Sequence, residues 1–291
     1  MRACIVRRVA AALMAATPEH MVEQGRRLYD EGRYAAAAEW WGRAVDVQHP
    51  HAHALLANLL IDGRHGFPQD HRRAFALASA GASMGCAHSR GVLGRCYSGC
   101  YGVPQDQAKA VELAMQSAAS GSCFGYFVLG VCYENGEGVL MDKGEAVRLW
   151  LLAAEQGHAA ALYNLGVMYK KGDAVEQSTS EAVRLWQLAA AQGHAPAQTN
   201  LAHLFYRGEG VETDSSEAVR LWRLAAEQGR STAQFNLAMM LCAGDGVEQD
   251  VEEAARWLRL AAAQGHQHAR TELVRLRAFG ACGALLSLAI G

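Results

Sequence analysis

Apolar and polar residues follow one another along this chain in a pattern that returns at a fixed interval. The phrase EAVRLWLLAAEQGH begins at residue 145, and close copies begin at residues 181 and 217, so successive copies lie 36 residues apart. Inside the phrase the apolar positions recur at helical spacing, three or four residues apart. The pattern therefore predicts a helix that is repeated along the chain and buries the same face each time.

Extending this alignment outward gives six units of equal length: 50–85, 86–121, 122–157, 158–193, 194–229 and 230–265. Each unit ends in glycine, which adopts the left-handed conformation at a helix end without a steric clash. Segments such as ALYNLGVMYKKG predict another helix before each phrase, and a GxGV turn follows in most units. We therefore expect two helices joined by a turn, with strain at Ala174, which replaces the second glycine of its turn.

The second helix of each unit begins with a capping signal. In four units a side chain that can accept a backbone hydrogen bond stands three positions before a glutamate: Asp142, Ser178, Asp214 and Asp250. This is the spacing of a capping box, in which each of the two side chains satisfies a free backbone N–H. Asp70 and Asp106 lack the glutamate, so weaker caps are expected there.

Two columns of alanine run through the second helices without exception. The first is Ala74, Ala110, Ala146, Ala182, Ala218 and Ala254, and the second is Ala82, Ala118, Ala154, Ala190, Ala226 and Ala262. Small residues let helices approach to about 8 Å, so we expect both columns at helix contacts. Four pairs three residues apart predict solvated salt bridges: Glu145/Arg148, Glu181/Arg184, Glu217/Arg220 and Glu253/Arg256.

A unit of two helices cannot bury its apolar face alone, so neighbouring units must share a continuous core. The sequence therefore predicts an all-α solenoid of about seven antiparallel helix pairs. We divide the chain into residues 17–49, a helix pair without the GxGV turn, the six units at 50–265, and a helical cap at 266–291.

Composition narrows the class of partner. The 27 Lys and Arg residues nearly balance the 29 Asp and Glu residues, and no block of like charge stands out, so nucleic acid is not expected as a partner. Any membrane association would come through a partner. The eight cysteines recur at no fixed paired spacing, which favours small buried thiols in a reducing compartment over a disulfide framework.

The first sixteen residues, MRACIVRRVAAALMAA, are basic and contain no acidic residue. They fit a secretory signal, an organellar transit peptide or an extra helix, and the sequence does not choose among the three. The expected location is the cytoplasm unless this segment targets the chain elsewhere.

The order of these residues resembles the Sel1-like repeat, a relative of the tetratricopeptide repeat. The resemblance covers residues 50–265 and runs from LG and Tyr through GxGV and Asp to A…W…AA…G, while residues 18–49 resemble a plain tetratricopeptide unit. It implies a right-handed superhelix of helix pairs. It also implies a non-enzymatic scaffold or adaptor that binds a peptide or helix of a partner protein on its concave face.

The resemblance also points to partner-binding residues. Asn164, Asn200 and Asn236 stand immediately before the Leu of the first helix, at a position that faces the groove in tetratricopeptide proteins. An amide suits this role because it both donates and accepts hydrogen bonds. Lys171, His203 and Arg207 follow on the same surface. The alternative is that the asparagines bridge neighbouring units.

The histidines are the remaining candidates for chemistry. His158, His194 and His266 follow the stop glycine and are expected in the first turn of the next helix. Histidines also gather at positions 49, 51, 53, 65 and 71, where His49 and His53 are four apart, although Pro50 disturbs the turn between them. We expect no metal site, no cofactor and no catalytic residue.

Two other functions stay open. A cysteine-rich branch of the family has been associated with β-lactam binding and hydrolysis, but this chain lacks the repeated cysteine pairs and contains no SxxK or GxSxG motif. A subunit of a lumenal quality-control complex would require residues 1–16 to act as a targeting segment.

Overall fold

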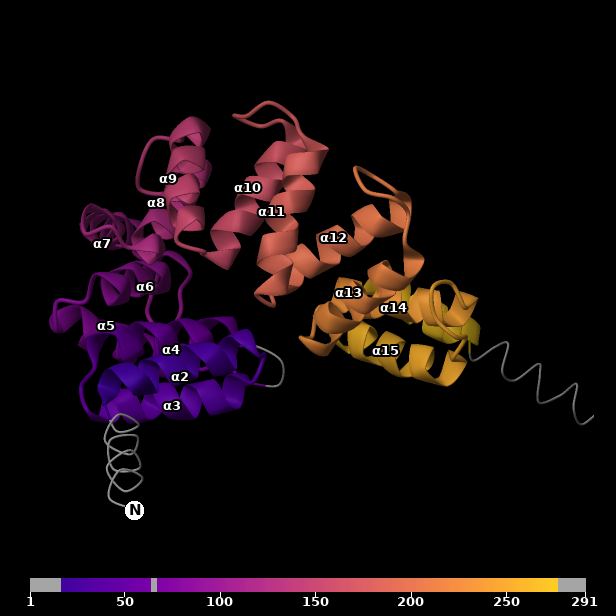
Figure 1. Cartoon of the computed structure of the whole chain (residues 1–291), viewed down its shortest axis with the longest axis horizontal. Helices are drawn as coiled ribbons and strands as arrows, with labels where there is room; N and C mark the ends of the chain where they lie inside the picture. Colours follow the sequence, from indigo (N-terminus) through magenta and orange to yellow (C-terminus); the bar gives the residue numbers. More distant parts are fainter. Residues whose placement is uncertain (1–16, 64–66, 277–291) are drawn as a thin grey trace, which may run out of the picture. The chain divides into compact units, whose positions relative to one another are not determined.

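The computed structural model describes residues 17–63 and 67–276 of the 291-residue chain. The chain divides into two compact units, residues 1–176 and 177–291, here called unit 1 and unit 2 (Figure 1). The described residues form helices joined by turns and contain no strand, as the sequence predicts for an all-α solenoid. No helix among them is both long enough and apolar enough to cross a membrane.

Unit 1 contains α2 (Pro18–Asp30), α3 (Tyr34–Asp46), α4 (Pro50–Asp62), α5 (His71–Ser83), α6 (Ala87–Ser98), α7 (Gln107–Ala119), α8 (Cys123–Asn135), α9 (Lys143–Glu155) and α10 (Ala159–Lys171). Consecutive helices pack as pairs, α2 with α3, α4 with α5, α6 with α7 and α8 with α9. The first helices also pack on one another, α4 on α6 and α6 on α8, so the pairs stack within the unit.

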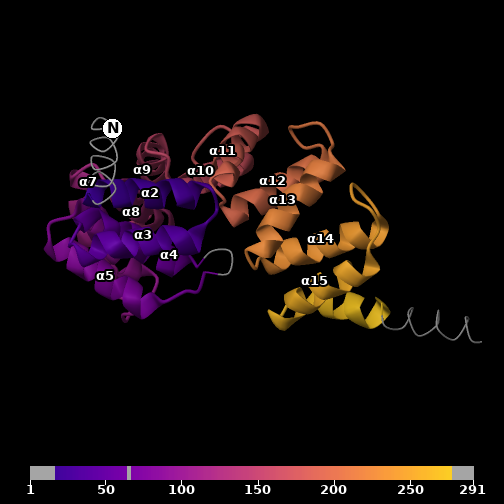
Figure 2. The same ribbon diagram turned by 60° about the horizontal axis from the view of Figure 1, so that its bottom comes forward.

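Unit 2 contains α11 (Thr179–Ala191), α12 (Ala195–Arg207), α13 (Ser215–Glu227), α14 (Ser231–Ala243) and α15 (Val251–Ala263), followed by helical residues 267–276. Here α12 pairs with α13 and α14 with α15, and Figures 1 and 2 both show α14 lying alongside α15. The rest of the predicted C-terminal cap, residues 277–291, and the N-terminal segment 1–16 lie outside the described residues.

The helix ends follow the predicted glycines. The stop glycines Gly85, Gly121, Gly157, Gly193, Gly229 and Gly265 have φ between 73° and 90°, the region that a Cβ disfavours. Ala174 has φ of 58°, so the expected strain in its turn is confirmed. The second glycine of the GxGV turn lies against the preceding 36-residue repeat. A Cβ at Gly138 would stand 2.9 Å from the carbonyl oxygen of Gln107.

The predicted caps form, but only half of each capping box does. Oδ1 of Asp142 accepts from the backbone N–H of Glu145 at 2.9 Å, whereas the Glu145 carboxylate binds Arg148. The backbone N–H of Asp142 donates to the carbonyl of Tyr133 in the preceding helix, so it does not need the glutamate. Asp70 and Asp106 cap their helices at 2.9 and 3.0 Å, so the expectation of weaker early caps was wrong.

Three of the four predicted salt bridges are present: Glu145–Arg148, Glu181–Arg184 and Glu217–Arg220. The fourth prediction was wrong. Glu253 pairs with Arg223 of α13 rather than with Arg256, and it also accepts a hydrogen bond from the indole of Trp257. Arg223, from the second helix of the preceding repeat, therefore takes the place of Arg256, the partner predicted within the same helix.

The core is built on the first alanine column, whose six members are fully buried. The second column is a partial correction, because only Ala190 and Ala226 are buried and the other four members are half-exposed. The residue one position earlier is the buried one, as at Ala153, Ala189 and Ala225. Since a helix turns by about 100° per residue, the contact with the next helix is centred one residue before the predicted column.

A tryptophan from the second helix fills the space against a small residue of the first. Trp150 of α9 is fully buried, and its indole N–H donates to the carbonyl of Phe127 at 3.3 Å. A Cβ on Gly130 of α8 would stand 2.5 Å from that indole nitrogen, so only glycine fits there. Gly25 and Trp41 repeat the arrangement in the first pair, where the indole donates to Val22. The LG motif is therefore a packing motif.

Candidate functional site

The candidate site is the face of the first helices that their second helices leave uncovered, which we call the first-helix surface. Its half-buried or exposed members are Asn58, Arg95, Phe127, Val131, Asn164 and Lys171 in unit 1, and Asn200, His203, Tyr206, Arg207, Asn236 and Met239 in unit 2. All of them lie on α4, α6, α8, α10, α12 or α14.

In unit 1 this surface carries a charged network. The guanidinium of Arg95 on α6 donates to Oδ1 of Asn58 at 2.6 Å and to Oδ1 of Asp62 at 2.7 Å, both on α4. Burial lowers the pKa of Arg95, but the Asp62 carboxylate outweighs burial, so the pKa is raised and the side chain stays charged. Because Arg95 reaches a neighbouring helix pair, the network fixes α4 against α6.

A small hollow adjoins this network between α6 and α8. It has a volume of about 190 Å³ and is lined by Arg95, Ser98, Gly99, Tyr101, Phe127, Val128 and Val131. The guanidinium of Arg95 lies 5.7 Å from the centre of the Tyr101 ring, within cation–π range. The hollow therefore combines aromatic walls with one cation at its edge. It is large enough for one side chain of a partner.

In unit 2 the same surface carries a neutral network. The side chain of Asn236 on α14 lies 3.2 Å from Nε2 of His203 on α12. The His203 ring packs edge-on against Trp222 of α13 at 5.2 Å, and Tyr206 lies 5.7 Å from the same indole. Burial, followed by the charge of Arg207, lowers the pKa of His203. A neutral imidazole accepts the Asn236 N–H, so Asn236 and His203 link α12 to α14.

Asn236 is the one predicted asparagine that this geometry engages. Within the described residues, Asn164 and Asn200 make no side-chain hydrogen bond and are half-buried. The sequence explains the difference. Three positions after the equivalent position in the preceding repeat stands His203 for Asn236, but Val131 for Asn164 and Val167 for Asn200. Lys171 is exposed at the end of α10, and Arg207 is exposed and pairs with Glu209 at 3.5 Å.

Arg95 and Asp62 were not predicted from the sequence as members of the candidate site. The available signal was a charged residue in a column that otherwise holds Leu59, Val131, Val167, His203 and Met239. A lone arginine among apolar residues at equivalent positions indicates a specific acidic partner, since a buried cation without one is costly.

The histidines after the stop glycines are helix caps rather than first-turn residues. Nδ1 of His158 accepts from the backbone N–H of Ala161 at 3.3 Å, and His194 and His266 do the same in their helices. The His158 ring also stacks on Phe127, with the ring centres 4.6 Å apart. These histidines are therefore structural.

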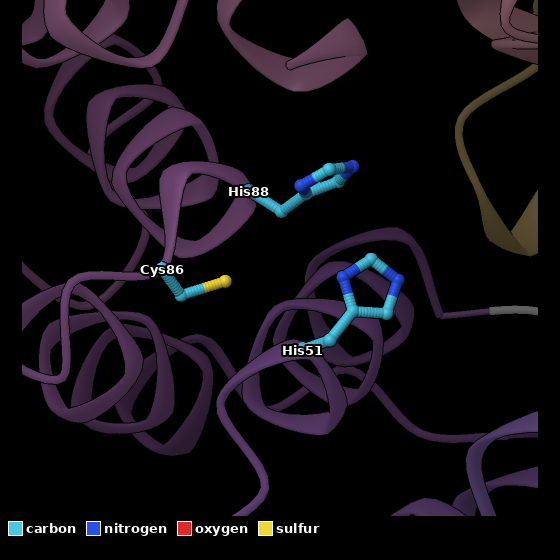
Figure 3. Close-up of side chains that lie close together, drawn as sticks. All are labelled: His51, Cys86 and His88. Atoms are coloured by element: carbon cyan, nitrogen blue, oxygen red, sulfur yellow. The ribbon is translucent and has the colours of Figure 1, made fainter. Parts of the chain in front are cut away.

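The described histidines among positions 49, 51, 53, 65 and 71 do not come together at one site. His49 caps α4, and Pro50 takes the first helical position instead of disturbing the turn. His53 is buried with Nδ1 bonded to the carbonyl of His49 at 2.9 Å, and His71 packs against Tyr101. His65 lies outside the described residues. His51 turns instead toward Cys86 and His88 (Figure 3).

The cysteines of the described residues are free thiols: Cys86, Cys96, Cys100, Cys123, Cys132 and Cys242. Burial raises the pKa of Cys96 to about 12, and those of Cys123 and Cys132 to about 11, so these three side chains are poor nucleophiles. Of these six cysteines only Cys96 and Cys132 are fully buried, whereas Cys86, Cys123 and Cys242 are half-buried and Cys100 is exposed, so the expectation of buried thiols holds for two of them. Cys4 and Cys282 lie outside the described residues.

Comparison with known proteins identifies the repeat. The Sel1 repeat pattern matches residues 50–86, 92–122, 124–158, 159–194, 195–229 and 231–266. No curated protein sequence matches the chain. A Sel1 repeat protein from Oxalobacter formigenes is similar in structure, with 28% identity and a TM-score of 0.64 over 89% of this chain and 76% of that one.

A second similar structure is c5321, a protective antigen present in uropathogenic Escherichia coli strains that displays the same type of repeat fold. It shares 28% identity and a TM-score of 0.59 over 93% of this chain, which spans 58% of the length of c5321. The repeat pattern covers most of the chain, and its alanines, glycines and tryptophans are the residues that build the stacked helix pairs. The chain thus belongs to the Sel1 repeat family, whose solenoid fold is typical of protein-interaction scaffolds.

Proposed function

We propose that the chain is a non-enzymatic scaffold that binds a peptide or a helix of a partner protein along the first-helix surface. One observation carries the proposal. The buried alanine column is identical in all six repeats. The column of Arg95 instead changes along the chain: it holds the buried Leu59 in the first repeat and then Arg95, Val131, Val167, His203 and Met239, which are half-buried or exposed. The buried residues of the stack repeat, whereas this column on the first-helix surface differs from repeat to repeat, as a surface that recognises one particular partner requires.

The chemistry of the surface suits a protein ligand. The side chains of Tyr206 and Met239 are large and mainly apolar, yet these residues are 43% and 36% exposed to solvent. Aromatic residues, Met and Arg are enriched in protein interfaces. Asn164 and Asn200 have side-chain amides that no neighbouring side chain uses within the described residues, so they are available to a partner's backbone.

Photocrosslinking tests the proposal with a matched control. A photoreactive amino acid at Met239 on α14 is expected to capture a protein partner in cells, whereas the same group at Leu224 on α13 is not. The two positions are 36% and 37% exposed and lie on a first and a second helix of the same unit. Equal capture at both positions, or capture only at Leu224, contradicts the proposed surface.

A second test uses the asparagines. Replacing Asn164 and Asn200 together by alanine should weaken capture of the partner found by crosslinking while the melting temperature hardly changes. Asn236→Ala is examined separately, because it also removes the hydrogen bond to His203. A marked fall in the melting temperature of the Asn164/Asn200 variant would mean that these residues support the fold instead.

The proposal also includes a cytoplasmic location. Six free thiols among the described residues support a reducing compartment. A fluorescent fusion should stay in the cytoplasm with or without residues 1–16. Loss of export on removing these residues would favour the lumenal alternative.

A further inference from the structure

The molecule brings together three metal-binding side chains that the partner-binding surface does not use. One ligand atom from each of His51, Cys86 and His88 lies within 4.8 Å of the other two. Figure 3 shows the Cys86 thiol and the two imidazole rings converging from α4 and from the start of α6. All three residues are half-buried.

We propose that His51, Cys86 and His88 form a Zn²⁺ site that links α4 to α6. Two imidazoles and one thiolate are a donor set that zinc accepts in proteins, and three protein ligands leave the fourth tetrahedral position open to water. The proposal is independent of the proposed scaffold function.

The distances are close to those of a bound site. With Zn–N bonds of about 2.0 Å and a Zn–S bond of about 2.3 Å, tetrahedral ligand atoms are separated by roughly 3.3–3.7 Å. The ligand atoms here lie within 4.8 Å of one another, so their separations have to shorten by at most about 1–1.5 Å, which is within the reach of side-chain rotation.

The surrounding contacts hold the ligands in place. His88 is flanked by two rings, with His51 at 4.6 Å and Phe124 at 5.7 Å between ring centres. Ser89, next to His88, donates to the carbonyl of Pro50 at 3.3 Å, which ties the start of α6 to the start of α4. The two helices that supply the ligands are thus fixed relative to each other inside unit 1.

Cys86 is available as a ligand because it leaves the usual capping role unused. It stands at the N-cap of α6, where His158 and His194 accept a backbone hydrogen bond in their helices, but its side chain makes none. Burial lowers the pKa of His51 to about 3 and also lowers that of His88, so both imidazoles are neutral at pH 7.

Arg26 limits the affinity of the site. Its guanidinium donates to Nε2 of His51, so the ring proton lies on Nδ1, the atom that faces Cys86 and His88. Metal binding at Nδ1 therefore requires Arg26 to release Nε2, which then carries the proton. A positive charge this close repels a dication, so Arg26→Gln should tighten metal binding on the order of tenfold. Arg26 is exposed on α2, and its replacement does not disturb the core.

Cobalt titration of the metal-free full-length protein tests the site. Co²⁺ should produce a thiolate-to-metal charge-transfer band and tetrahedral d–d bands at one equivalent, and Zn²⁺ should abolish them because it binds more tightly. Cys86→Ser should lose the charge-transfer band and weaken binding on the order of 100-fold, since a ligand is removed. Cys100→Ser removes an exposed thiol of the same unit and should leave the spectrum unchanged.

A second measurement needs no variant. Zn²⁺ should protect Cys86 from alkylation in the wild-type protein, as measured by peptide mass spectrometry, while Cys100 remains reactive. Absence of a charge-transfer band, a band that persists in Cys86→Ser, or equal alkylation of Cys86 with and without Zn²⁺ would each overturn the proposal.

Discussion

The first helices of the two units present different chemistry on the same framework. In unit 1, Arg95 reaches Asp62 and Asn58 and places a charge on the surface. In unit 2, His203 stands in the column of Arg95 and joins Asn236 and Trp222 in a neutral, aromatic network. Both networks tie one first helix to the next. The comparison teaches that the framework specifies where neighbouring pairs are joined, but not with what chemistry.

The largest expected effect comes from the buried tryptophans, which test whether the framework is the same in both units. Trp150→Ala and Trp222→Ala should each lower the free energy of unfolding by about 3–5 kcal/mol, because both leave a large cavity. Hydrogen exchange should show the loss mainly in unit 1 for Trp150→Ala and in unit 2 for Trp222→Ala. The same loss of protection in both units for either variant would contradict this expectation.

Replacement by phenylalanine separates the two tryptophans further. The indole N–H of Trp150 donates to Phe127, whereas that of Trp222 has no partner within the described residues. Trp150→Phe should therefore cost about 1 kcal/mol more than Trp222→Phe in urea unfolding.

The next effect tests the charged network against the neutral one. Arg95→Met should lower the free energy of unfolding by about 1–3 kcal/mol, because it leaves the Asp62 carboxylate partly buried without its guanidinium. Asn236→Ala should cost about 0.5–1.5 kcal/mol, because it removes one hydrogen bond between uncharged groups. Urea unfolding measures both.

The double variant Arg95→Met/Asp62→Asn is the control for the charge. It should recover part of the stability lost in Arg95→Met, since no partly buried carboxylate remains. If the double variant is less stable than Arg95→Met, the pair acts through packing and not through charge.

A smaller effect, of opposite sign, is expected at Ala174. Ala174→Gly should raise the free energy of unfolding by about 0.5–1 kcal/mol, because glycine adopts φ of 58° without a Cβ clash. The control is Ala108→Gly at an exposed helical position of α7, which should lower stability by about 0.5–1 kcal/mol. Thermal unfolding of both variants measures the difference, and destabilisation by Ala174→Gly would show that the methyl group packs favourably.

The smallest effect is the pH dependence of the neutral network. The pKa of His203 is lowered in the folded protein, so the unfolded chain binds the proton more readily. The stability that neutral His203 contributes is therefore complete above about pH 6.5, the unfolded value, and is lost as pH falls below it. His203→Gln should lose less stability between about pH 7 and 5 than the wild type, as measured by urea unfolding at each pH. An equal loss in both proteins would show that His203 does not contribute.

The framework was predictable from the sequence because it depends on spacing that recurs. Stop glycines, N-caps and the first alanine column each have the same local role in every 36-residue repeat, so their recurrence identifies them in the sequence. The errors arose where a residue binds outside its own helix. Glu253 forms its ion pair with Arg223 and not with Arg256. The backbone N–H of Asp142 donates to the carbonyl of Tyr133 and not to the Glu145 carboxylate.

The candidate site was less predictable for the same reason. Asn236 could be named from its column, but its link to His203 depends on the stacking of α12 and α14. His51 comes from one 36-residue repeat, and Cys86 and His88 come from the next. Neither the spacing nor the order of these residues forms a known metal-binding motif. Contacts between units need the stacking geometry, which a single unit's pattern does not contain.

The second glycine of the GxGV turn has a consequence for how such a chain can change in length. Four glycines at this position each rest on the first residue of the second helix in the preceding repeat: Gly102 on His71, Gly138 on Gln107, Gly210 on Thr179 and Gly246 on Ser215. In the turn of Gly102 the first glycine is replaced by Cys100. In these four pairs of repeats, the start of the second helix therefore forms the surface against which the turn of the next repeat packs. A duplication or deletion of one whole 36-residue repeat keeps each turn glycine packed against the second helix of the repeat before it. An insertion or deletion of any other length separates these two contacting residues.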